Sequence, residues 1–286
     1  MKHILQFFGI LLVMLHPSCH ARDVTVERDV SFGQADGELL LLDIFRPTLA
    51  TASPRPAVIF IHGGGWGSGG KEDYTDAAMK LVRQGYVTAS INYRLVKQGR
   101  NRWPAQLDDA QRAVRWLRAN AGKHGIDPQR IGALGYSAGG HLAACLGTRE
   151  TRDNSDPALA SHSSRVTCVV DMSGPSDLTE QASAPGDRLV HALLGGTPAE
   201  QSAAARDASP LHWVDVKSAP FLIIHGRLDD LVPPRQGERL AAALRNAGVE
   251  SQLLVFEDEG HGFTKKENTD HMIRKTLAFL QTHLSP

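Results

Sequence analysis

The chain has 286 residues, and its 31 lysines and arginines balance its 31 aspartates and glutamates. A chain of this length can bury one large core, which favours a single domain. The balanced charge provides no overall field to attract nucleic acid or an anionic membrane surface, so a neutral or small-molecule partner fits better.

The N-terminus has the pattern of a targeting segment. Lys2 supplies a positive charge, residues 4–15 are mostly apolar, and Cys19-His20-Ala21 offers small residues where a signal peptidase cuts. The apolar stretch is too short to span a bilayer comfortably. We therefore predict a signal peptide over residues 1–21 and a secreted or periplasmic mature domain over residues 22–286.

Two alternatives remain for this segment: a buried N-terminal helix, or a lipid anchor on Cys19. The lead-in His16-Pro17-Ser18 is poor for lipidation, which makes the anchor a minority hypothesis. Cleavage after Ala21 would leave only Cys145 and Cys168. Two cysteines make no disulfide framework, so buried free thiols are favoured, although export would permit a bridge.

Apolar runs and helical patterns alternate along the rest of the chain. A hairpin is predicted from residues 24–32 and 39–45 around the turn Ala35-Asp36-Gly37. Continuous apolar runs, typical of strands buried on both faces, follow at residues 57–61, 86–91, 131–134, 166–171, 221–225 and 252–256. Helical patterns lie at residues 74–84, 104–121, 138–146, 235–247 and 271–283, and the second is expected to end at Gly122.

This alternation predicts an α/β fold with a mostly parallel sheet of about eight strands and helices on both faces. Reactive groups are then expected at the carboxyl ends of the strands. Residues 173–214 are predicted to form a small cap-like insertion, with one helix over residues 187–194 that ends at Gly195-Gly196.

The pentapeptide Gly135-Tyr136-Ser137-Ala138-Gly139 stands between an apolar strand and a helical run. A strand, a sharp turn and a helix are the setting of a nucleophile elbow, in which a serine hydroxyl is exposed on a strained bend. Gly135 and Gly139, two positions before and after Ser137, carry no Cβ that could collide with the strand or the helix. We therefore predict Ser137 as the nucleophile of a serine hydrolase.

Further motifs stand in a fixed order around this elbow: HGGGW at residues 62–66, NYRL at 92–95, HGRLDDLVP at 225–233 and EGHGF at 259–263. Together they resemble the α/β-hydrolase superfamily, and most of all its small bacterial esterases related to hormone-sensitive lipase and to the esterase domains of bifunctional xylanases. The resemblance covers nearly all of the chain from Val24 onward. It is specific for fold and reaction and much less specific for substrate.

The resemblance implies a triad of Ser137, Asp229 and His261. A serine needs a base to take its proton, and His261 stands in a glycine-flanked loop after the last predicted strand. The acid must orient that histidine, and the family pattern places it at Asp229, with Asp230 and then Asp258 as rivals. The other histidines considered are interpreted as structural or surface residues: His141, His212, His225 and His283.

The resemblance also implies an oxyanion hole made by the backbone N–H groups of Gly64, Gly65 and Ala138. Trp66 and Tyr93 are candidate substrate-binding residues, with aromatic packing as the alternative for both. His62 is interpreted as a residue that braces the glycine loop.

Other kinds of site are disfavoured by the sequence. No GK[ST] follows the glycine loop, which argues against a phosphate site, and no histidine or cysteine cluster has zinc-like spacing. Asp108 and Asp109 resemble a catalytic carboxylate pair, but nearby arginines favour a solvent-facing or loop-bracing role. We expect no metal and no cofactor.

The sequence thus predicts a carboxylesterase that acts through an acyl-enzyme on short-chain acyl esters, with acetyl or feruloyl groups on plant polysaccharide as candidates. An open cleft under a small cap is the reason for this choice. The alternatives are an arylformamidase-like amide hydrolase and, from another class, a non-catalytic binding protein on a hydrolase scaffold. The expected substrate is a small-molecule or polysaccharide-linked ester, and the chain is expected to be a monomer or homodimer without stable membrane insertion.

Overall fold

The computed structural model describes residues 24–49, 51, 53–180 and 184–285. The predicted signal peptide over residues 1–21 and Cys19 lie outside the described residues. Within the described ranges, no helix has both the length and the apolar character needed to cross a bilayer. Cys145 and Cys168 are both buried free thiols, as predicted.

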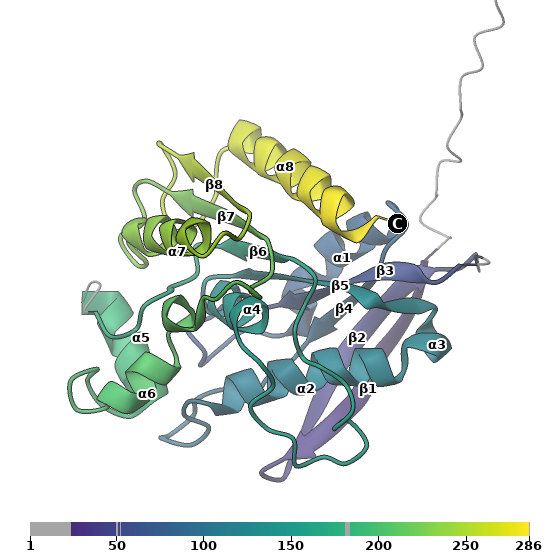
Figure 1. The fold of residues 1–286 in the computed structure, drawn as a ribbon, viewed down its shortest axis with the longest axis horizontal. Helices are drawn as coiled ribbons and strands as arrows, with labels where there is room; N and C mark the ends of the chain where they lie inside the picture. The colour runs from purple at the N-terminus through teal and green to yellow at the C-terminus, as the bar shows by residue number, and fades with distance from the viewer. Residues whose placement is uncertain (1–23, 50, 52, 181–183, 286) are drawn as a thin grey trace, which may run out of the picture.

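One sheet holds eight strands in the described part of the chain (Figure 1). The strands are Val24–Ala35 (β1), Glu38–Pro47 (β2), Arg55–Ile61 (β3), Val87–Ile91 (β4), Ile126–Tyr136 (β5), Val169–Met172 (β6), Phe221–Gly226 (β7) and Ser251–Phe256 (β8). Their order is β1-β2-β4-β3-β5-β6-β7-β8. The β1–β2 and β2–β4 pairs are antiparallel and the other pairs are parallel, which confirms the predicted mostly parallel sheet.

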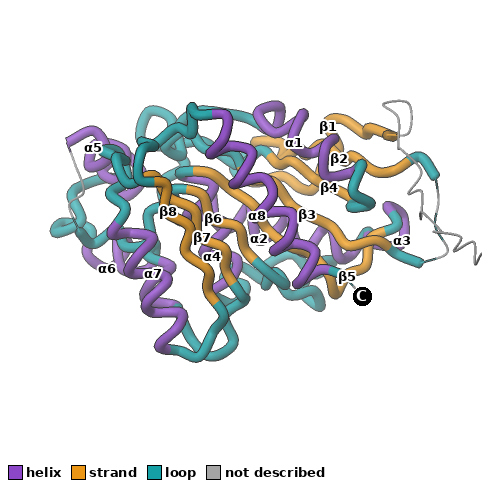
Figure 2. The backbone as a smooth tube through the Cα atoms, turned by 90° about the horizontal axis from the view of Figure 1, so that it is seen from above, coloured by secondary structure: helices purple, strands orange, loops and turns teal. Residues whose placement is uncertain are grey.

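Helices cover both faces of this sheet. They span Thr75–Val82 (α1), Ala105–Ala119 (α2), Ala121–His124 (α3), Ala138–Thr148 (α4), Ala184–Leu194 (α5), Ser202–Asp207 (α6), Arg235–Asn246 (α7) and Lys266–Leu284 (α8), with short 3-10 helices at Lys71–Tyr74 (η2) and Pro210–Trp213 (η3). One buried apolar cluster packs α2, α4 and α7 on the sheet, and a second packs α1 and α8. Figure 2 shows α8 lying across the strands. Strands β3, β4, β6 and β7 are almost wholly buried because both faces are covered.

Two helix boundaries differ from the prediction. Gly122 lies inside α3 rather than ending α2, and the left-handed residue that ends α3 is Gly125, with φ +67°. Helix α8 begins at Lys266 instead of residue 271. Its first turn is polar, so the apolar periodicity could not show where it starts.

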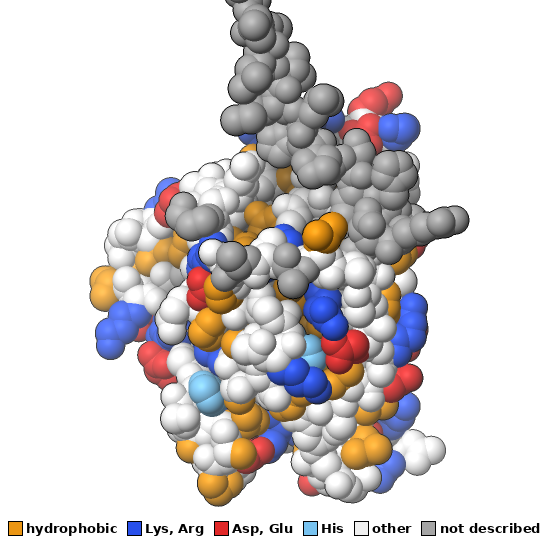
Figure 3. Space-filling model, turned by 90° about the vertical axis from the view of Figure 1, so that its right-hand side faces the viewer, with side chains coloured by type: hydrophobic (Ala, Val, Ile, Leu, Met, Phe, Trp, Pro, Cys, Tyr) orange, Lys and Arg blue, Asp and Glu red, His pale blue; other side chains and the backbone are white. Residues whose placement is uncertain are grey.

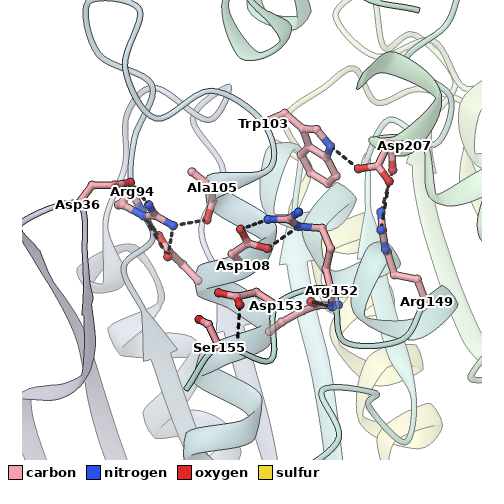
Figure 4. Close-up of polar contacts among 12 residues, drawn as sticks. Asp36, Arg94, Trp103, Ala105, Asp108, Arg149, Arg152, Asp153, Ser155 and Asp207 are labelled. Atoms are coloured by element: carbon pink, nitrogen blue, oxygen red, sulfur yellow. Dashed lines mark hydrogen bonds and ion pairs between the residues drawn. The ribbon is translucent and has the colours of Figure 1, made fainter. Parts of the chain in front are cut away.

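The segment of residues 173–214 carries α5, α6 and η3, so it holds more helix than the predicted stretch over residues 187–194. Gly195 has φ +84° and its N–H reaches the carbonyl of His191, which ends α5 where the sequence predicted. Asp207, the last residue of α6, accepts hydrogen bonds from Trp103 at 2.7 Å and Arg149 at 3.1 Å (Figure 4). These bonds attach the insertion to the body of the domain.

The described surface mixes both signs of charge. On the face shown in Figure 3, Lys and Arg side chains alternate with Asp and Glu side chains instead of gathering by sign. This distribution agrees with the balanced composition of the chain.

Helix α4 begins in direct contact with the end of β3. A Cβ built on Gly139 would lie 1.9 Å from the carbonyl oxygen of Ile61 and 2.7 Å from that of His62. Both neighbours are backbone atoms and have little room to move aside. The absence of a side chain at residue 139 therefore sets how close α4 can approach β3.

We expect Gly139→Ala to destabilise the protein by about 3 kcal/mol or more, because the new methyl group must push two backbone elements apart. Gly122→Ala is the matched control, since a Cβ there meets nothing within 4 Å. That change should be neutral or stabilise by up to about 1 kcal/mol through helix propensity. Urea unfolding of both variants measures the difference, and a Gly139→Ala protein as stable as wild type would contradict the packing described.

Candidate active site

Ser137 occupies a strained turn between β5 and α4. Its backbone has φ +56° and ψ −122°, a conformation that residues with a Cβ rarely adopt. A Cβ on Gly135 would lie 2.1 Å from the carbonyl oxygen of Gly139. The two glycines of the motif therefore allow the strand and the helix to meet closely enough to present Ser137 on the bend, as the sequence predicted.

The structure brings Ser137, His261 and Asp229 into one hydrogen-bonded row. His261 Nε2 lies 2.9 Å from Ser137 Oγ, and His261 Nδ1 lies 2.8 Å from Asp229 Oδ2. A carboxylate only accepts, so Nδ1 carries the proton of the neutral ring and Nε2 is left free to accept the serine proton. Ser137 follows β5, Asp229 follows β7 and His261 follows β8, so all three lie at the carboxyl ends of strands.

The carboxylate of Asp229 is buried and fully occupied. Its Oδ1 accepts the backbone N–H groups of Leu231 at 3.0 Å and Val232 at 2.8 Å. Burial alone would raise the pKa of Asp229, but hydrogen bonds from His225, His261 and the Val232 N–H outweigh it and hold the pKa well below its usual range. The group therefore stays ionised opposite His261 at neutral pH.

The rival acids lie elsewhere. Asp230 is exposed, whereas Asp229 is 4% exposed. Asp258 is exposed and pairs with Lys265, which together with Asn268 holds its pKa below the ordinary value. Of the three aspartates, Asp229 is the one in hydrogen-bond contact with His261.

Gly65 and Ala138 lie beside Ser137 in the wall of one pocket. Ala138 is the first residue of α4, where backbone N–H groups have no partner within the helix and can turn toward a ligand. Gly65 and Gly64 have φ +57° and +98°, so the loop uses backbone conformations that favour glycine. Gly64 does not line this pocket, and its carbonyl accepts the N–H groups of Gly67 and Ser68 at 3.1 Å.

Of the two roles considered for Tyr93, the described contacts are those of aromatic packing. Its hydroxyl donates to the carbonyl oxygens of His62 at 3.0 Å and Gly63 at 3.2 Å, and its ring stacks on His62 with centroids 4.1 Å apart. Tyr93 therefore supports the glycine loop from beneath and does not line the pocket that holds Ser137. His62 takes part in the same bracing, as predicted.

Trp66 does line that pocket, and two further contacts fix its ring. Trp66 Nε1–H donates to His141 Nδ1 at 3.2 Å, and His141 Nε2 lies 2.6 Å from the carbonyl oxygen of Ala208. This chain of bonds requires a neutral His141 with its proton on Nε2. Burial lowers the pKa of His141 to about 4, which keeps the ring neutral at ordinary pH.

The rest of the pocket is largely apolar. Leu189 of α5 lies directly over the glycine loop, since a Cβ on Gly65 would be 2.7 Å from Leu189 Cδ2. Four more apolar side chains complete this part of the wall: Leu178, Val190, Leu231 and Val232. The cavity is small, about 30 Å³. No sequence motif marked Leu189, because only the folded position of α5 brings it here.

Asp108 and Asp109, which resemble a catalytic carboxylate pair in the sequence, are both engaged in ion pairs. The guanidinium of buried Arg94 contacts both Asp109 and Asp36, and Asp108 pairs with Arg152 (Figure 4). Asp109 thus braces the loop of Arg94 as a buried group. Among the described residues, no group of three or more His, Cys, Asp and Glu side chains could hold a metal ion.

Residues 42–244 match the family model BD-FAE. The chain belongs to the BD-FAE family. Among curated proteins, this BD-FAE chain is 33% identical to "Esterase LipQ" of Mycobacterium tuberculosis over 84% of its own length. The match covers 58% of LipQ, so the chain spans little more than half the length of that relative.

Solved structures extend the comparison of this BD-FAE member to esterases with the same fold. A truncated form of a carbohydrate esterase from gut microbiota is 29% identical with a TM-score of 0.73, over 88% of this chain and 96% of that one. An acetyl ester-xyloside bifunctional hydrolase from Caldicellulosiruptor lactoaceticus is 27% identical with a TM-score of 0.75, over 88% and 93% of the two chains. The α/β-hydrolase fold predicted from the sequence is confirmed.

We expect Asp229→Asn to lower kcat/KM for an aryl acetate by about 1,000-fold or more, because an amide there can donate toward His261 and favour the wrong tautomer. Asp230→Asn makes the same chemical change one residue away on an exposed side chain and should stay within about threefold of wild type. Steady-state kinetics on both variants decides between them. The reverse ranking would move the acid to residue 230.

Proposed function

We propose that this protein is a serine carboxylic ester hydrolase. The observation that carries the proposal is the row Ser137–His261–Asp229, which ends in a small pocket beside Gly65 and Ala138. The named esterases among its relatives and structural neighbours support the same reaction.

The proposed reaction has two halves, acylation and deacylation, and the same groups act in both. His261 Nε2 takes the proton of Ser137 Oγ as that oxygen attacks the ester carbonyl carbon, and Asp229 stabilises the resulting imidazolium. The imidazolium then protonates the departing alcohol, which leaves an acyl group on Ser137. A water molecule attacks the acyl-enzyme in the same way, with His261 again as base, and releases the acid.

The negative oxygen formed in each attack needs donors that are already in place. We assign this role to the N–H groups of Gly65 and Ala138, which lie beside Ser137, with Gly64 as a third candidate. Each donor of this kind contributes roughly 3 kcal/mol of transition-state stabilisation. The strained turn supports the assignment, since it sets Ser137 and the Ala138 N–H next to each other.

The proposed substrates are short-chain acyl esters, with an acetyl group on plant polysaccharide as the favoured case. The apolar wall beside Ser137, over which Leu189 lies, suits a small acyl group such as acetyl. The similarity to an acetyl ester-xyloside hydrolase supports the same choice.

We also propose export, so that the mature protein works in the periplasm or outside the cell. The support is the sequence pattern of residues 1–21. Expression with its own N-terminus in a bacterial host should yield a mature chain that begins near Arg22, as read by N-terminal sequencing of the periplasmic or secreted fraction. An intact Met1 would refute the proposal.

The direct test of the proposed function is a panel of acetyl, butyryl and octanoyl aryl esters, acetylated xylan and a feruloyl ester. We expect wild type to hydrolyse the acetyl substrates best and Ser137→Ala to lose turnover by several orders of magnitude, because its side chain has no nucleophile. Circular dichroism confirms that the variant is folded. Absence of wild-type hydrolysis on every ester would favour a binding protein on a hydrolase scaffold.

The position of Leu189 predicts a change in acyl preference. Leu189→Ala should raise the butyryl-to-acetyl ratio of kcat/KM by about 10-fold, since each added methylene in an apolar pocket is worth about 1–3 kcal/mol. Leu194→Ala is the matched control, because it truncates a leucine of the same helix that does not line the pocket. An unchanged ratio in Leu189→Ala, or an equal change in both variants, would contradict the assignment of Leu189 to the acyl site.

A further inference from the structure

The imidazole of His225 lies against the acid of the triad. His225 is the fifth residue of β7 and its side chain is completely buried. Its Nε2 lies 3.4 Å from Asp229 Oδ2, the same oxygen that His261 Nδ1 contacts at 2.8 Å. One carboxylate oxygen is thus shared by two imidazole rings.

The surroundings of His225 fix where its proton sits. Nε2 faces two acceptors, the Val232 carbonyl oxygen at 2.8 Å and Asp229 Oδ2, so this nitrogen carries the N–H. Nδ1 is buried without a hydrogen-bond partner and faces the backbone of α7, where a Cβ on Gly237 would lie 2.9 Å away. The ring is therefore held as a donor aimed at the turn that carries Asp229.

Val232 closes a ring of contacts with these two residues. Its N–H donates to Asp229 Oδ1 at 2.8 Å, while its carbonyl oxygen accepts from His225. His225 thus holds the turn of residues 229–232 from the side of the strand and contacts the carboxylate as well. These contacts fix the orientation of the Asp229 carboxylate, which must keep one oxygen directed at His261.

We propose that His225 is a positioning residue for ester hydrolysis: through its Nε2–H, shared between Val232 and Asp229, it holds the Asp229 carboxylate in the direction that orients His261. The inference rests on the proposed function. It goes beyond the triad, because His225 touches neither Ser137 nor the pocket. It adds a role in orienting the acid to the interpretation of His225 as a structural residue.

Two amide variants separate positioning from filling of the core. In His225→Gln the side-chain nitrogen can reach the place of Nε2 and donate to both acceptors. In His225→Asn the nitrogen stops near the place of Nδ1, and the place of Nε2 is left empty. Both replacements are neutral, polar and no larger than histidine, so they differ mainly in where the donor lies.

A third variant controls for truncation of a buried histidine. His124 is 2% exposed, and its Nδ1 lies 3.5 Å from Glu27 Oε1, a carboxylate contact much like that of His225. It lies just before β5, at the opposite ends of the strands from Ser137. His124→Asn removes the same atoms as His225→Asn. Urea unfolding of all three variants ensures that kinetics are compared between folded proteins.

We expect His225→Asn to lower kcat for an aryl acetate by about 10- to 100-fold with KM within about twofold. A loss of this size is typical when a residue that hydrogen-bonds a catalytic group, without touching the substrate, is replaced. His225→Gln should recover kcat to within about threefold of wild type, and His124→Asn should match wild type. An Asn variant as active as wild type, or a Gln variant as impaired as Asn, would overturn the inference. Should His225→Asn not fold, His225→Thr, which also leaves the place of Nε2 empty, takes its place in the comparison with His225→Gln and is read in the same way.

Proton NMR gives a readout that a structural role would not move. The Nδ1–H of His261, bonded to Asp229, should give a far-downfield signal in wild type and His225→Gln that is shifted or lost in folded His225→Asn. An identical signal in all three proteins would contradict the inference. If wild type itself hydrolysed no ester, the proposed function would fail, and that result differs from any outcome among active variants.

Discussion

The close approach of strand β5 and helix α4 is the constraint on which the rest of the site depends. The carbonyl oxygen of Gly139 comes so near Gly135 that no Cβ fits there, and Gly139 in turn contacts the end of β3. This contact forces Ser137 into a positive φ and places the Ala138 N–H at the free start of α4. One packing contact thus sets the proposed nucleophile and a proposed oxyanion donor together, close to the glycine loop that follows β3.

The polar groups around this turn are arranged so that charge lies where the reaction needs it. Asp229 is the buried anion, and four donors from two backbone amides and two imidazoles keep it ionised. His141 is held neutral by burial while it fixes Trp66 at the pocket wall. The neighbouring ring of His225 donates through one nitrogen only. Buried polar side chains here are therefore paired with specific partners, as a low-dielectric site demands.

Much of this arrangement could be predicted from the sequence. Continuous apolar runs located six of the strands, the hairpin pattern located the other two, and glycine spacing located the elbow, because these features depend on local sterics and burial. The triad could be predicted through the family resemblance of its motifs, and each of its members lies in the turn or loop that follows a strand. The start of α8 was missed, since its polar first turn has no apolar stripe, and Gly122 was misassigned because a helix end depends on backbone angles that composition does not reveal.

The pocket was harder to predict because it depends on contacts between distant segments. Leu189 reaches the glycine loop only through the docking of the inserted segment, which Asp207 attaches to Trp103 and Arg149. Tyr93 follows a strand, as pocket residues often do, yet its hydroxyl finds the carbonyls of the loop and its ring stacks on His62. The partners of His225 are close in the chain, at Asp229 and Val232, but no sequence pattern shows that the turn brings them to its Nε2. The roles of Leu189 and Tyr93 are set by tertiary neighbours.

Covalent labelling is the direct test of whether Ser137 is an activated nucleophile. An organophosphate such as paraoxon should react with the protein until one phosphoryl group is attached per chain, found by peptide mass spectrometry on Ser137, with esterase activity lost in proportion. Ser137→Ala should remain unlabelled. Full activity after treatment, or a label on another residue that accounts for the loss, would contradict the account.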